Sequence, residues 1–381
     1  MKKLVSILMV TVIISASAAV LKLPGIAGAV PTKVQGAEMP ESDFPLPPWS
    51  NSFDVATGAG GIAMGGAVSA NPYLKSSFRF NPAVLAESEG LEGYFSFRPS
   101  NVGMYESDYY SMGLTMETSV AVFALDYSRH VSDQHGLFAY PELTYTEGES
   151  FDYTVTASAS RNLYRGFSAG VNLKYYQRGV NYLSFNLSDI ESDGAWAMDA
   201  GLLYRGRGIV RSESAKDHFR LALAVRNLGT SFEYIGMKFD LPIILRAGIS
   251  YQLSQGTRWG RELVRFILAG EYRRWMNDDG KYEDKTDYFN YGMEALFLET
   301  FSLRFGGMVT PEYGIYGKAD HVNFFGAGLE MSLQRFSSAG VPLSVSIDYA
   351  YVPSVDSNYF FDDDNSANVF TIAISYNNQI F

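Results

Sequence analysis

Apolar and polar residues alternate along many short segments of this chain. The clearest case is 219–227, where every second residue as far as Val225 is large and apolar and the residues between them include two arginines. A period of two residues is that of an extended strand and excludes a helix, whose period is 3.6. The same alternation recurs at 245–252, 264–271, 343–349 and 370–376. Each strand therefore has an apolar face, on which we expect Leu221, Leu245 and Ile347, and a polar face.

The links between these segments alternate in length. We count about fourteen segments, each near the length of a tilted membrane strand. The long, polar links are 99–108, 130–150 and 179–194, and the short ones include 117–118, 162–166, 254–261, 299–300 and 334–340. Short periplasmic turns on one rim and long loops on the other are typical of an outer-membrane barrel. One link departs from this rule, because 206–218 should be short and is long.

The composition agrees with a barrel. The chain has 26 Tyr and 26 Phe and only 19% charged residues, yet its mean hydropathy of -0.05 is too polar for a helical membrane protein. Aromatic girdles around a polar lumen produce this balance. After the first thirty residues, no stretch has the roughly twenty apolar residues that a spanning helix needs. The sequence predicts an all-β fold, a transmembrane antiparallel β-barrel over 91–381.

The amino terminus has the pattern of a secretory signal. Lys2 and Lys3 precede an apolar run at 4–14 and small residues around 16–19, which predicts a signal peptide within 1–29. Cleavage after Ala18 and cleavage after Ala29 both stay open. A proline-rich linker is expected at 30–52. The absence of cysteine excludes a lipidated amino-terminal cysteine and a disulfide framework.

Residues 53–90 do not have the barrel pattern. They contain a glycine-rich run at 58–68 and an Asn-Pro turn signal at Asn81 and Pro82. A glycine-rich loop cradles phosphate where it joins a strand to a helix in an α/β unit, and this sequence contains no such unit. Glycine instead allows close backbone packing, and Asn-Pro precedes a short helical stretch. We expect a plug with one or two helical turns, folded into the barrel mouth.

These motifs resemble a known family. Gly-Ile-Ala-Met-Gly-Gly-Ala at 61–67, followed by Asn-Pro-Ala at 81–83, is similar to the amino-terminal signature of the PorV/PorQ proteins and of the wider FadL-like outer-membrane barrels. Further similar motifs occur at 227–229, 241–248, 325–330 and 348–351, so the resemblance covers 53–376. It implies a fourteen-stranded barrel with an amino-terminal plug. The plug residues to which it assigns gating are Gly61, Met64, Gly65, Gly66, Asn81 and Pro82.

One departure concerns the plug. Relatives often have an acidic pair before Asn-Pro-Ala, whereas 71–77 of this chain contains no acidic residue. A plug contact that depends on those acids is therefore not expected here.

Charged and amide residues fall on the polar faces of the predicted strands. The expected lumen-facing residues are Asn172, Lys174, Asp199, Arg220, Arg226, Arg246, Glu271, Arg273, Arg304 and Asp348. Two interpretations stay open. These residues either form ion pairs that cross-link the lumen and hold the plug, or line a path for a solute.

The sequence disfavours catalysis and nucleic-acid binding. The four histidines are His130, His135, His218 and His321, and none has a serine and a carboxylate at a catalytic spacing. His130 and His135 fall in a predicted loop, without the further ligands that a metal site needs. A net charge of -11 opposes binding to nucleic acid. We therefore expect no enzyme activity and no cofactor or metal.

The resemblance implies two functions. FadL-like relatives take up hydrophobic small molecules, whereas PorV implies a shuttle or attachment platform for exported proteins of a type IX-like secretion system. A structural barrel without transport is the third alternative. All three imply the outer membrane of a Gram-negative bacterium, contact with its lipid, and assembly by the barrel-assembly machinery through the last strand and Phe381.

Overall fold

The computed structural model describes most of the predicted plug and barrel. The described residues are 58–102, 105–139, 144–182, 190–210, 215–234, 237–258, 261–277, 287–309, 321–332, 342–353 and 367–376. The predicted signal peptide, the predicted linker and Phe381 lie outside these ranges.

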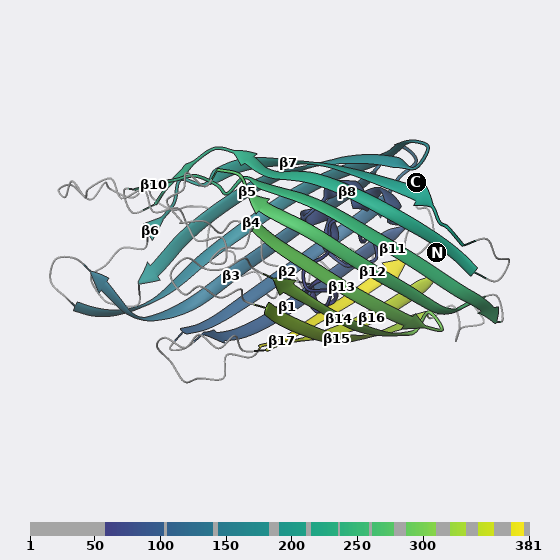
Figure 1. Cartoon of the computed structure of the whole chain (residues 1–381). Coiled ribbons are helices and arrows are strands. Elements are labelled where there is room, and N and C mark those ends of the chain that lie inside the picture. Colours follow the sequence, from purple (N-terminus) through teal and green to yellow (C-terminus); the bar gives the residue numbers. More distant parts are fainter. Residues whose placement is uncertain are drawn as a thin grey trace.

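Fourteen long strands in the described ranges form a closed antiparallel barrel (Figure 1). They are β1 (Leu91–Val102), β2 (Tyr105–Glu117), β3 (Val122–Ala139), β4 (Thr144–Tyr164), β5 (Phe167–Tyr182), β7 (Ala195–Arg207), β8 (Ala215–Gly229), β11 (Ile244–Arg258), β12 (Arg261–Trp275), β13 (Asp287–Phe297), β14 (Phe301–Val309), β15 (His321–Ser332), β16 (Leu343–Val352) and β17 (Ala367–Tyr376). Pairing of β1 with β17 and of β4 with β5 closes the ring, so no edge of the sheet stays open. The predicted fold class is confirmed.

Three short strands lie outside this ring. β6 (Ile190–Glu191) adds to the edge of β5, and β9 (Phe232–Tyr234) pairs with β10 (Met237–Phe239) as a separate hairpin. The hairpin belongs to the connection between β8 and β11, and its aromatic residues pack against Tyr176 and Val180 of β5.

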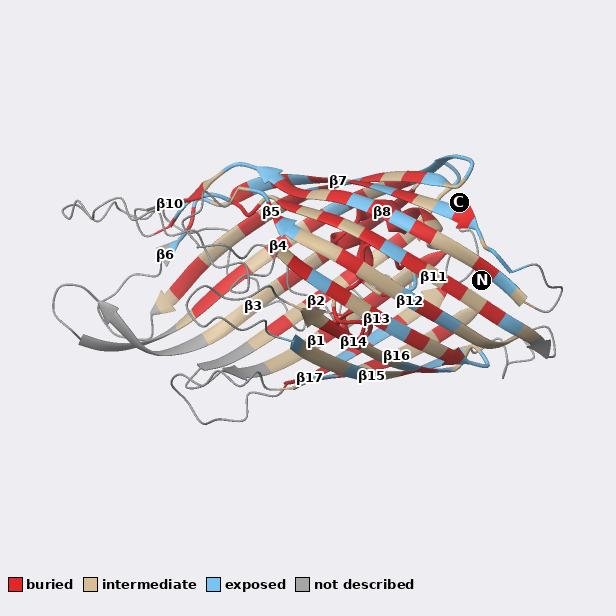
Figure 2. Cartoon of the chain, in the orientation of Figure 1, coloured by how far each residue is buried: buried red, intermediate tan, exposed pale blue. Residues whose placement is uncertain are grey.

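The two faces of the barrel strands differ as the alternation predicts. In β8, Leu221 is 46% exposed on the outer face, whereas its neighbour Arg220 is 1% exposed on the inner face. The same alternation forms bands of buried and exposed residues along the strands in Figure 2. Ile347 is also exposed, and Leu245 is half-buried. Large apolar side chains outside and polar ones inside are the arrangement of a membrane-spanning barrel.

The connections differ in part from the predicted lengths. On one rim, the described turns at 118–121, 165–166 and 298–300 are short, as expected. On the other rim, the prediction of long links at 99–108 and 130–150 was wrong. β1 and β2 pair as far as Val102 with Tyr105, and β3 and β4 pair as far as Ala139 with Thr144. Turn-forming residues in these segments take part in strand pairing, since a ladder supplies hydrogen bonds to any non-proline backbone.

Longer strands also explain why the link at 206–218 seemed too long for the rim of the short turns. β7 ends at Arg207 and β8 begins at Ala215, so the connection is 208–214 rather than 206–218. It lies on the rim of the short turns. His130, expected in a loop, lies within β3, where its ring stacks on Tyr109 at 4.1 Å.

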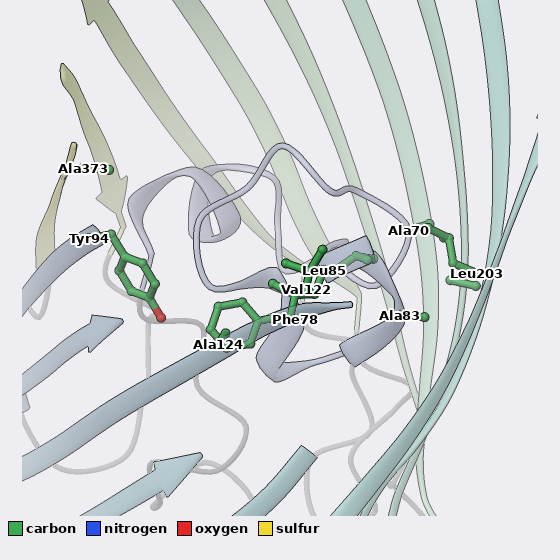
Figure 3. Packing of buried hydrophobic residues seen from close by; sticks show 11 residues of the cluster. Ala70, Phe78, Ala83, Leu85, Tyr94, Val122, Ala124, Leu203 and Ala373 are labelled. Atoms are coloured by element: carbon green, nitrogen blue, oxygen red, sulfur yellow. The ribbon is translucent and has the colours of Figure 1, made fainter. Parts of the chain in front are cut away.

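The chain from 58 to 90 lies inside the barrel and forms the plug. It contains α2 (Ala59–Ala63) and two 3-10 helices, η2 (Ser77–Arg79) and η3 (Pro82–Glu87). In Figure 3, Phe78 and Leu85 of the plug lie beside Val122 and Ala124 of the wall. Among the described residues, no helix has the length and apolar character needed to cross a membrane.

Candidate functional site: the plug and the vestibule

The plug backbone lies directly against the barrel wall at glycines. Gly65 and Gly66 have φ of 64° and 81°, which glycine adopts without strain. A Cβ on Gly306 of β14 would lie 2.3 Å from the Gly65 nitrogen, and a Cβ on Gly201 of β7 would lie 2.0 Å from Asn81 Oδ1. Side chains at these wall positions would push the plug away. The backbone at Gly65 therefore packs directly against a glycine of the wall.

A buried carboxylate in the wall binds the plug backbone. Glu271 Oε2 of β12 accepts hydrogen bonds from the backbone nitrogens of Val68 and Ser69 at 3.0 and 2.7 Å. The other carboxylate oxygen of Glu271 pairs with Arg246 of the neighbouring strand β11. Charge-assisted bonds to a buried carboxylate are stronger than neutral ones. This cluster fixes the middle of the plug to the wall.

Asn81 joins two parts of the plug to each other and to the wall. Its Oδ1 caps η3 by accepting the Ala83 backbone N–H at 3.0 Å, and Pro82 occupies the first turn of that helix. Its Nδ2 donates to the carbonyls of Ser69 at 2.8 Å and Leu202 at 3.2 Å. The predicted Asn-Pro turn is thus a helix cap.

The remaining predicted plug residues lie in the interior of the plug. Met64 is fully buried and packs with Val68, Leu74 and Phe80. Gly61 is buried in α2, where an added Cβ would lie 3.2 Å from Val68 Cγ1. Little free volume therefore remains around Met64 and Gly61.

Polar groups from three wall strands meet at one side of the plug. Asp199 of β7 pairs with Lys174 Nζ of β5 at 2.6 Å, accepts from Asn172 Nδ2 at 2.8 Å and lies 3.9 Å from Arg226 Nε of β8. Asn172 Nδ2 also donates to the Phe78 carbonyl of the plug at 3.0 Å. The cluster pairs the buried carboxylate of Asp199 with cations and holds the plug at the same time.

Two guanidinium groups lie close to the ring of Phe80 in the plug. Arg226 Cζ is 4.9 Å and Arg246 Cζ is 4.7 Å from the centre of its ring. Cations over an aromatic face interact favourably within about 6 Å. The two arginines come from adjacent strands of the wall, so Phe80 connects the Glu271 cluster to the Asp199 cluster.

The other predicted lumen residues also form contacts inside the barrel. Arg304 pairs with Glu294 and Asp348, both at 2.5 Å. Arg273 lies opposite Arg246 in the β11–β12 ladder, and its guanidinium stacks 4.0 Å from the Tyr288 ring centre. The structure thus places all ten predicted residues on the inner face and brings most of them together around the plug.

A cavity of about 800 Å³ lies between the plug and the rim of the short turns. We call it the vestibule. Plug residues 72–78 line one side of it, and the turn at 298–300 contributes to the other. Its acidic lining residues are Glu87, Glu89, Glu92, Glu262, Glu294, Glu299, Glu330 and Asp348, and its basic ones are Lys75, Arg205, Arg265 and Arg304. The vestibule is a polar compartment with an excess of carboxylates.

Several contacts of the plug were not found from the sequence. Arg220 binds Glu87 of the plug at 2.9 Å and the Tyr73 hydroxyl at 3.2 Å. Lys75 of the plug pairs with Glu92 of β1. No periodic pattern marks Tyr73, Lys75 or Glu87, because their partners depend on how the plug sits in the barrel.

Comparisons with known proteins support the fold. The structure is similar to that of the toluene transporter TodX of P. putida, with a TM-score of 0.51 and 11% identity over 85% of this chain and 98% of that one. It is also similar to the monoaromatic hydrocarbon channel CymD, with a TM-score of 0.50 and 13% identity over 86% and 99% of the two chains. No family model and no curated protein matches the sequence.

Proposed function

We propose that this protein is an outer-membrane channel of a Gram-negative bacterium that passes hydrophobic small molecules. The observation that carries the proposal is a closed barrel with an apolar outer face whose lumen contains a plug formed by the chain's own amino-terminal segment. A barrel of fourteen strands is wide enough to hold more than its own side chains. The likeness in fold to TodX and CymD supports an apolar solute of monoaromatic size.

In this proposal, the plug is the gate and the inner face of the wall holds it closed. Gly61, Met64, Gly65, Gly66, Asn81 and Pro82 set its closed position, which is supported by their close packing. The lumen-facing ion pairs act as its supports, since Glu271 and Asn172 bind plug backbone directly. Outer-membrane lipid covers the outer face, and the barrel-assembly machinery recognises the last strand and Phe381.

Native mass spectrometry of the protein, extracted from its own membrane in mild detergent, tests the proposal. A bound apolar small molecule is expected, and its mass identifies the solute class. Extraction in a second detergent of different mass serves as the control for detergent adhering to the barrel. A bound exported protein with no small molecule would contradict uptake and favour the shuttle.

A further inference from the structure

The plug is held to the wall unevenly along its length. Residues 67–71 and 76–86 are buried throughout, whereas 72, 73 and 75 are partly exposed. Tyr73 is 37% exposed, although its neighbour Leu74 is only 4% exposed. We call residues 72–76 the roof segment, because they line the vestibule on the plug side.

The roof segment contacts the wall through side chains, whereas the flanking parts also bind the wall through backbone groups. Before it, Val68 and Ser69 donate their backbone N–H groups to Glu271, and the Ala70 carbonyl accepts from Ser250 Oγ at 2.7 Å. After it, the Phe78 carbonyl accepts from Asn172. Backbone anchors of this kind cannot move without breaking buried hydrogen bonds, which is costly.

The side chains of Tyr73 and Lys75 hold the roof segment itself. The Tyr73 hydroxyl donates to Gln252 Oε1 at 2.9 Å and accepts from Arg220. The Tyr73 ring also lies 4.4 Å from the guanidinium carbon of Arg265 and 5.3 Å from that of Arg220. Lys75 pairs with Glu92, and both side chains are about one-fifth exposed, at 21% and 20%. Glu92 is held in place by Ser375 Oγ at 2.7 Å. Because the Lys75–Glu92 pair borders water in the vestibule, breaking it costs less than breaking the buried anchors.

The geometry at the two ends of the roof segment is suited to hinges. At the first end, Asn71 Oδ1 accepts the Tyr73 backbone N–H at 3.2 Å in a local turn. At the other end, Ser76 has a φ of 64°, a left-handed conformation that is strained for a non-glycine residue. A rotation at Ser76 relieves this strain. The vestibule offers about 800 Å³ of space into which the segment can move.

We propose that the roof segment is the moving part of the plug and that the Lys75–Glu92 ion pair is its latch. The rest of the plug stays fixed to the wall during opening. The role of this motion in uptake rests on the proposed function, but the motion itself can be measured without any solute. When the segment swings into the vestibule, Leu74 leaves the core that it shares with Met64 and Phe80 and becomes accessible from water.

Thiol labelling tests this motion, because the chain has no cysteine of its own. Leu74→Cys reports on the roof segment, and Val68→Cys, which is as deeply buried, reports on the anchored part. Each is labelled with a water-soluble maleimide in the purified full-length protein, with Glu92 intact or replaced by Gln. Breaking the latch should raise the labelling rate at 74 about fivefold, as expected for a partly exposed ion pair, and leave the rate at 68 unchanged.

The outcomes separate the inference from its alternatives. Equal acceleration at both positions would overturn it, since the plug would then loosen as one body. No acceleration at either position would also overturn it, because the ion pair would not be a latch. Lys75→Met must reproduce the effect of Glu92→Gln, and the heat-dependent electrophoretic shift of a folded barrel confirms that each variant folds. A labelling contrast that persists in a protein without uptake would support the motion and contradict the proposed function.

Discussion

The wall and the plug satisfy their backbone hydrogen-bonding groups in different ways. Each wall strand pairs with a strand on either side, so the ring is complete in itself. The plug has only short helices, and part of its backbone binds wall side chains such as Thr371, which accepts the Ala59 N–H at 2.8 Å. A membrane barrel must satisfy every backbone group internally, whereas a segment inside a polar lumen can use side chains. The plug therefore depends on the wall for its backbone hydrogen bonds, whereas the wall does not depend on the plug.

Deletion of residues 58–87 tests this dependence most strongly. We expect the barrel to assemble, because the strand ladder needs no contribution from the plug. The expected result in planar bilayers is a change from a closed baseline to steady open-pore currents, since the emptied lumen fills with water. If the shortened chain fails to fold, the wall depends on the plug. If the currents remain at the baseline, the plug does not close the lumen. Either result would contradict the proposed relation between the wall and the plug.

The second prediction removes the strongest connection between the two regions. Glu271→Ala takes the carboxylate from Arg246 and from two plug N–H groups. Breaking a buried pair of this kind should lower the free energy of unfolding by about 3–5 kcal/mol. Glu262→Ala at the vestibule is the control and should change it by less than about 1 kcal/mol. Equal effects in denaturant titrations would show that the Glu271 cluster is not an anchor.

The third prediction concerns the outer face of the wall, which the plug does not touch. Leu221→Lys places a charge in the apolar band and should destabilise the folded barrel by about 2–4 kcal/mol in lipid. Leu163→Lys at the rim should cost about 0–1 kcal/mol, because the lysine reaches water. Refolding equilibria in lipid vesicles measure both. If the two substitutions cost the same, Leu221 does not face lipid.

The smallest expected effect belongs to the ring of Phe80. A double-mutant cycle with Phe80→Leu and Arg226→Met should give a coupling energy of about 0.5–2 kcal/mol, the usual range for a cation over an aromatic face. The single substitutions also change packing, and the cycle removes that contribution. A coupling energy of zero in denaturant titrations would mean that the arginines only surround Phe80 without attracting it.

The sequence predicts the wall well because strand faces are a local property. Alternation around Leu221 and Arg220 identifies both the strand and its two environments, and the first strand begins at Leu91 as expected. The lengths of the hairpins were predicted less well. Polar, turn-forming residues at 99–108 continue the ladder in β1 and β2, and their types alone do not show where pairing stops.

The plug was predictable only in outline. Its glycines indicate close packing, but the wall residues that they meet depend on how the chain closes into a ring. Ser69 and Glu271 are 202 residues apart, and no local pattern connects them. Lys75 and Glu92 are near in sequence, yet nothing in either residue type shows that the plug turns back to meet the first strand.

The most direct test of the whole account is uptake of a labelled monoaromatic hydrocarbon by cells of a diderm host that produce the full-length protein in the outer membrane. Cells that carry the empty vector are the reference, and the protein level is measured in each culture. The account predicts a faster initial rate of uptake with the protein than without it, and a further increase with Glu92→Gln. Equal rates in all three cultures, with the barrel folded and present in the membrane, would contradict it.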